Sequence, residues 1–163
     1  DNDLPDGINP LLCGKGWKRK CELSLAHKRS FITQRAMSCS PLFAGGDLTT
    51  LEAEDLELMT HPKMLACNRN GICGKLVYMA GDAQVWQVSH RTKRGAGWLA
   101  VFNRNPAHGK ETIQLTHNAL RLSPKTRLHD VWEDRYIGLL GDNPTMTIEV
   151  DAVVFIEYSD SGR

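Results

Sequence analysis

The sequence predicts an α/β segment followed by an all-β domain. Three observations support this fold class. A helical pattern runs from Ser24 to Ser38, and an apolar strand, a Gly-Gly turn and an amphipathic helix then follow one another, which is the order of a βα unit. From about residue 71 onward, seven short apolar segments alternate with turn residues, as in antiparallel sandwiches and barrels. We therefore expect two parts, 1–70 and 71–163.

The first part is expected to contain one strand and three helices. Pro41–Ala44 is apolar throughout, so we expect a strand buried on both faces, as parallel strands are. Ser24–Ser38 is expected to form the first helix, and a capping box at Thr49–Glu52 predicts the start of the second. Pro62 ends that helix, since proline lacks the backbone N–H that a helix interior needs, and a short helical run follows. The side chains expected to be buried on the second helix are Leu51, Leu56, Leu58 and Met59.

The second part is expected to form two antiparallel sheets packed face to face. Turn residues separate its strands, which are predicted at Leu76–Met79, Gln84–His90, Gly97–Phe102, Glu111–Leu115, Thr126–Trp132, Met146–Val150 and Val153–Tyr158. The side chains expected to point into the shared core are Trp86, Val88, Leu99, Val101, Val154 and Ile156.

Composition and charge exclude several classes of partner. The 163 residues carry 20 Lys and Arg against 19 Asp and Glu, so no strongly charged partner such as nucleic acid is expected. No apolar run approaches the roughly 20 residues of a membrane span, so no membrane partner is expected either. The five cysteines are irregularly spaced and define no disulfide framework, and no cofactor is expected. The opening DNDLPDG predicts a processed or truncated start.

Several segments, taken in chain order, have counterparts in one known enzyme group. They are DNDL at Asp1–Leu4, SPLFAGGDLTTLEAEDLELMTHPKMLACN at Ser40–Asn68, AVFNR at Ala100–Arg104, LHDVWEDRYIG at Leu128–Gly138 and the closing VDAVVFIEY. They resemble motifs of the α-galactosidase (melibiase) clan of glycoside hydrolases. In that clan the first two belong to the end of the catalytic barrel, and the others belong to the C-terminal β-domain.

The resemblance implies a fold, an activity and a few site residues. It implies the last βα units of a (β/α)₈ barrel over 1–70 and a C-terminal antiparallel β-sandwich over 71–163. The parent enzyme would be a retaining glycosidase acting on terminal α-galactosides or α-N-acetylgalactosaminides, with two carboxyl groups roughly 5–5.5 Å apart. In the clan both catalytic aspartates precede the motif that DNDL resembles, so no catalytic residue is expected here. Asp3 and Leu4 are expected to bind substrate, although Asn2, Leu4 and Gln34-Arg35 depart from the clan pattern.

The resemblance also leads to expectations about behaviour. The chain alone is expected to be inactive and to associate with itself through an incomplete barrel surface. A secreted, periplasmic or lysosomal compartment is compatible with the clan, and localisation stays open. The main rival interpretation is a non-catalytic β-sandwich module that binds carbohydrate or a protein partner.

Some residues allow a chemical interpretation beside a structural one. Asp1 and Asp3 would form an acid pair on one strand face, or a polar chain start. Asp47 would lie at the catalytic face of a barrel, or cap the next segment. Cys67 and Cys73 with a histidine, His61 or His90, would suggest zinc, but their C-x₅-C spacing is more typical of core or loop thiols.

Two further groups of residues also allow both a functional and a structural interpretation. The basic stretch Lys15–Lys20 around Trp17 would suggest a nucleic-acid or phosphate site, or a solvated loop, which the nearly neutral chain favours. A sugar-stacking platform or ordinary strand packing would explain the aromatic residues Tyr78, Trp86, Trp98 and Trp132, and packing is the commoner role.

Overall fold

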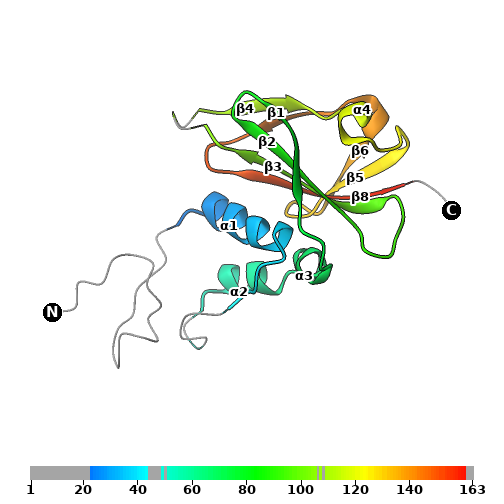
Figure 1. The fold of residues 1–163 in the computed structure, drawn as a ribbon. Helices are drawn as coiled ribbons and strands as arrows, with labels where there is room; N and C mark the ends of the chain where they lie inside the picture. Colours follow the sequence, from blue (N-terminus) through cyan, green and yellow to red (C-terminus); the bar gives the residue numbers. More distant parts are fainter. Residues whose placement is uncertain (1–22, 44–48, 50, 106, 108, 161–163) are drawn as a thin grey trace.

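A computed structural model describes residues 23–43, 49, 51–105, 107 and 109–160 (Figure 1). Three helices come first: α1 (Leu25–Met37), α2 (Ala53–Thr60) and α3 (Pro62–Arg69). The strands follow as β1 (Lys75–Ala80), β2 (Ala83–Ser89), β3 (Ala96–Asn103), β4 (Glu111–Gln114), β5 (Thr126–Asp130), β6 (Arg135–Leu139), β7 (Thr145–Ile148) and β8 (Val153–Asp160). A short helix, α4 (His117–Leu120), lies between β4 and β5, and a 3₁₀ turn (Leu140–Asp142) follows β6.

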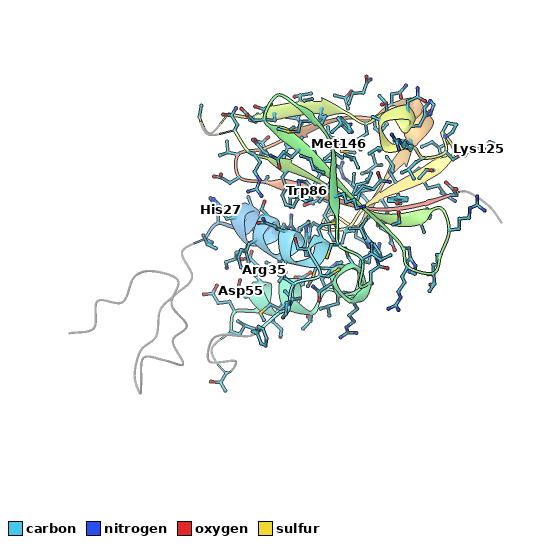
Figure 2. The ribbon with its side chains drawn as sticks, in the orientation of Figure 1. His27, Arg35, Asp55, Trp86, Lys125 and Met146 are labelled. Atoms are coloured by element: carbon cyan, nitrogen blue, oxygen red, sulfur yellow. The ribbon has the colours of Figure 1, made fainter. Side chains whose placement is uncertain are left out.

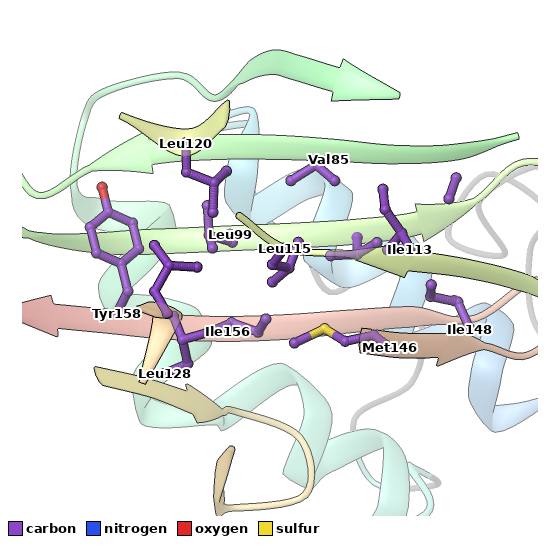
Figure 3. Packing of buried hydrophobic residues seen from close by; sticks show 13 residues of the cluster. Val85, Leu99, Ile113, Leu115, Leu120, Leu128, Met146, Ile148, Ile156 and Tyr158 are labelled. Atoms are coloured by element: carbon purple, nitrogen blue, oxygen red, sulfur yellow. The ribbon is translucent and has the colours of Figure 1, made fainter. Parts of the chain in front are cut away.

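The described residues form three layers: the helices, a central antiparallel sheet and a smaller second sheet (Figure 1). That sheet has six strands in the order β1-β2-β3-β8-β5-β6, and β4 pairs with β7 in a second, two-stranded sheet. Side chains of both sheets share one core, seen in Figure 3, which includes Val85, Leu99 and Ile156 with Ile113 and Ile148. The helices cover the other face of the large sheet in a second core, which includes Ala36, Met64, Trp98, Val131 and Phe155.

The seven predicted strands are all found, with ends that differ by one or two residues. An eighth strand, β6, was missed. It lies at the edge of the large sheet, where Arg135 and Tyr136 are exposed, and its pairing with β5 is irregular between Leu128 and His129. An edge strand of this kind shows no clear alternation of apolar and polar residues, so its pattern is weak.

The predicted inward-facing residues divide between the two faces of the large sheet. Leu99, Val101, Val154 and Ile156 face the two-stranded sheet, as predicted. Trp86 and Val88 face the helices instead, so their predicted direction was wrong. The physical reason is that helices cover the second face, and the central strands are therefore apolar on both sides.

The helix predictions were correct at two starts and wrong at one. The Ser24 side chain caps α1 by accepting from the His27 N–H, and Pro62 stands in the first turn of α3. The capping box at Thr49–Glu52 was wrong, because α2 begins at Ala53 and its N-cap residue, Glu52, makes no side-chain cap bond.

Two burial predictions near α2 were also wrong. Leu56 is 52% exposed, and Leu58 is the one buried residue of α2. Of the predicted strand Pro41–Ala44, the described residues 41–43 are not in a strand, and Phe43 is 85% exposed. A strand needs a hydrogen-bonded neighbour, and no strand precedes β1 among the described residues. The boundary between 1–70 and 71–163 stays a prediction, although α1 packs directly on β3 and β8.

Candidate functional site

The residues predicted to bind substrate, Asp3 and Leu4, lie outside the described residues, and so do Asp1, Asp47 and Lys15–Lys20. Their roles therefore stay predictions. Two concave surfaces and one partly exposed polar seam in the described part of the chain are each built from a different set of elements.

The first surface is an apolar groove of about 460 Å³ between α1, α2 and residues 41–43, called here the helix groove. Phe31 of α1 is 53% exposed beside it, and Phe43 is more exposed still. Asp55 of α2 binds Lys28 of α1 across the rim at 2.6 Å, and Figure 2 shows Asp55 and Arg35 on the two neighbouring helices. The other apolar lining residues are Leu23, Ile32, Pro41, Leu42, Leu51, Leu58 and Met59. Such a lining suits an apolar surface better than a sugar, which needs hydrogen-bonding groups.

The polar seam joins α1 to the segment after β5. The Trp132 indole Nε1 donates to the Thr33 hydroxyl at 2.9 Å, and the Arg29 guanidinium binds Glu133 at 2.6 Å. Asp130 accepts the backbone N–H groups of Trp132 and Glu133 at 3.1 and 3.2 Å, and burial raises the pKa of this carboxyl. The segment that resembles the clan motif therefore fastens the helices to the sheet.

The second surface is a polar cleft of about 620 Å³ between α3 and the large sheet, called here the α3 cleft. Lys63 Nζ lies 3.1 Å from His129 Nδ1, 3.2 Å from Asp134 and 4.0 Å from Glu157. His129 Nε2 lies 3.5 Å from the same Asp134 oxygen. The hydrogen bond and charge of Lys63 lower the pKa of Asp134. No sequence motif indicates this cleft, because its residues come from α3, the β2–β3 loop and the four strands β3, β5, β6 and β8.

The cysteine and aromatic groups differ in burial and in position. Cys67 is buried against Met37, and burial raises the pKa of its thiol, whereas Cys73 is exposed. The described residues hold no group of three or more His, Cys, Asp or Glu that would suit a metal ion. Tyr78 packs on the opposite face of the large sheet from Trp98, so the aromatic residues form no single platform. No helix among the described residues is long and apolar enough to cross a membrane.

Comparison with known proteins gives a consistent result. No protein-family model matches the chain. Alpha-galactosidase 2 of Arabidopsis thaliana is 31% identical over 100 residues, which is 60% of this chain and 25% of that protein. The alpha-galactosidase of Coffea arabica is 26% identical over 106 residues, covering 64% of this chain and 28% of the relative. The chain thus spans little more than a quarter of these curated relatives.

Solved structures show the same fold over most of the chain. A GH27 β-L-arabinopyranosidase from Geobacillus stearothermophilus matches 91% of this chain with a TM-score of 0.77 at 21% identity, and 33% of its own chain is covered. Alpha-galactosidase I from Mortierella vinacea matches 85% with a TM-score of 0.74 at 16% identity, and 36% of that chain is covered. Together with the sequence matches, these likenesses confirm the predicted resemblance: the chain is a distant relative of the α-galactosidases and corresponds to part of their length.

Proposed function

We propose that this chain is the C-terminal part of a retaining glycoside hydrolase that acts on terminal α-galactosides or α-N-acetylgalactosaminides. The observation that carries the proposal is the asymmetry of coverage. The arabinopyranosidase structure matches 91% of this chain, whereas the chain covers 33% of that structure. A portion of such an enzyme would align over nearly its whole length with about a third of the complete enzyme, as this chain does.

The helix groove supports the same proposal. Exposed apolar side chains gather around it, among them Leu23, Phe31 and Phe43. Large exposed apolar patches on soluble proteins usually mark surfaces that another element covers. In the proposed enzyme the remaining barrel polypeptide covers this groove. In the chain alone a second copy covers it instead.

Two pairs of carboxylates that share a lysine among the described residues do not suit a retaining acid pair. Glu54 and Asp55 both bind Lys28, at 3.6 and 2.6 Å. Asp134 and Glu157 both lie around Lys63. A nucleophile and a proton donor need different pKa values and a shared substrate position, which carboxylates neutralised by a lysine do not offer. We therefore propose that the chain alone is inactive and that Asp3 and Leu4 contribute one wall of the sugar pocket in the complete enzyme.

The test compares the purified chain with the polypeptide encoded together with its upstream reading frame, on an aryl α-galactoside. The chain alone should show no turnover. The longer polypeptide should hydrolyse the substrate, and Asp3→Asn should lower its kcat/KM about tenfold or more, as expected when a charged hydrogen bond to substrate is lost. Turnover by the chain alone that disappears in Asp1→Asn or Asp3→Asn would contradict the proposal. So would an upstream frame that encodes no barrel, which would favour a non-catalytic binding module.

A further inference from the structure

The floor of the α3 cleft is a row of side chains across four strands. In the register of the large sheet Trp98 lies opposite Glu157, Glu157 opposite His129, and His129 opposite Tyr136. Directly paired residues point to the same face of a sheet, so the row runs across β3, β8, β5 and β6 on one face. Trp98 belongs to the core beneath the helices, which places the row on the α3 side.

One polar group in this floor has no partner. Trp98 is 2% exposed, and its indole Nε1 has no hydrogen-bond acceptor among the described residues. An unpaired buried donor is destabilising, and native proteins rarely leave one. Trp98 lines the cleft, so a ligand seated there lies beside this indole, whose Nε1 atom is itself buried.

The loop above the floor presents a second donor. The His90 ring stacks on the Trp98 indole with centroids 5.5 Å apart. His90 Nδ1 accepts the backbone N–H groups of Thr92 and Lys93 at 3.1 and 3.0 Å. A neutral imidazole that accepts at Nδ1 carries its proton at Nε2, so His90 is a donor on that side.

The charges of the cleft are unevenly compensated. Lys63 is neutralised by Asp134 and Glu157. Lys93 and Arg127 also line the cleft, and neither has a carboxylate within 4.0 Å among the described residues. The Arg127 guanidinium lies over the Tyr136 ring, 5.4 Å from its centroid, which holds it in place without neutralising it.

We propose that the α3 cleft binds a sugar acid, a monosaccharide that carries a carboxylate. Arg127 and Lys93 bind its carboxylate, because guanidinium and ammonium groups form strong charge-assisted bonds with oxyanions. Glu157 and Ser159 also line the cleft, and the Glu157 carboxylate and the Ser159 hydroxyl can accept hydrogen bonds from the hydroxyl groups of the same ligand. A volume of about 620 Å³ is far larger than a lone anion requires and lies within the range of small-molecule sites. This inference does not depend on the proposed glycosidase activity.

The test is a titration of the full chain with galacturonate, followed by the indole N–H signals of the ¹⁵N-labelled protein in NMR spectra. The Trp98 signal is assigned by elimination through Trp17→Phe, Trp86→Phe and Trp132→Phe, because the chain has four tryptophans. Galacturonate should shift the Trp98 signal with saturation below about 10 mM, and neutral galactose and acetate should leave it in place at the same concentrations. Arg127→Gln should weaken binding about tenfold, the usual cost of a lost charged hydrogen bond.

The matched control is Lys75→Gln, which removes the same charge from an exposed residue of β1 outside the cleft and should leave the affinity within about twofold. Both substituted positions are exposed, so the variants should keep the dispersed spectrum of the folded chain. No shift with galacturonate, an equal shift with galactose or acetate, or equal weakening by Lys75→Gln would each overturn the proposal.

Discussion

The hydrogen bond between Trp132 and Thr33 should couple the helical layer to the sheet. Thr33 is fully buried on α1, and its hydroxyl accepts the Trp132 indole N–H at 2.9 Å, across 99 residues of sequence. Thr33→Val keeps the side-chain shape but leaves Nε1 unpaired, which costs about 1–3 kcal/mol for a buried donor. Trp132 is half-buried, so we expect about 1–2 kcal/mol. Trp132→Phe removes the donor and part of the packing against Phe155 and His61.

The measurement is a double-mutant cycle in urea, with unfolding followed by circular dichroism and fluorescence. The double variant should be more stable than the sum of the single effects predicts, by about 1 kcal/mol, because the bond is lost only once. Thr145→Val, at an exposed position of β7, is the control and should change stability by less than about 0.5 kcal/mol. Additive effects, or a helical layer that unfolds in a separate step, would refute the coupling.

Three further predictions concern stability, reactivity and association. Asp130→Ala should cost about 1–3 kcal/mol by leaving two backbone N–H groups unpaired, whereas Asp130→Asn keeps an acceptor. Burial raises the pKa of Asp130 above its ordinary value of 3.8. The folded state therefore favours the protonated form, and in urea melts the stability of the wild type relative to Asp130→Asn should fall as pH rises above that value. A thiol reagent should label exposed Cys73 in the native chain and buried Cys67 only after unfolding; equal native rates would contradict the buried site. The chain should associate with rising concentration in sedimentation experiments, and Phe31→Ser with Phe43→Ser should abolish this; a wild-type monomer throughout would exclude association through the groove.

Most strands were predictable because each is short, apolar and bounded by turn residues. Their faces were harder to assign. In β3 every residue from Gly97 to Asn103 is buried, so the strand shows no alternation that would separate its two sides. Period-two reasoning then placed Trp86 and Val88 in the same core as Leu99, although helices cover their side. The helical layer is a tertiary feature, and a strand pattern does not report which element lies on it.

The local signals around α2 failed for a related reason. Thr49–Glu52 has the composition of a capping box, yet the helix begins after Glu52. Helix starts depend on packing as well as on the cap, and Leu58 is the one buried residue of α2. Because α2 buries so little within the described chain, packing does little to fix where it begins. Its buried and half-buried residues Asp55, Leu58 and Met59 are the ones that line the helix groove.

The α3 cleft could not have been predicted from any local motif, because strand register creates it. His129 and Arg127 are two residues apart on β5, and each reaches the cleft only because β5 pairs with β8 through Glu157 and Ser159. A shift of one residue in that pairing would turn both side chains to the opposite face. The buried Thr126 hydroxyl donates to Asp160 at 2.7 Å at the end of the same pair of strands, which helps to fix the register. The charged floor of the cleft is therefore a consequence of contacts between residues about 30 positions apart, and the sequence spacing alone does not predict those contacts.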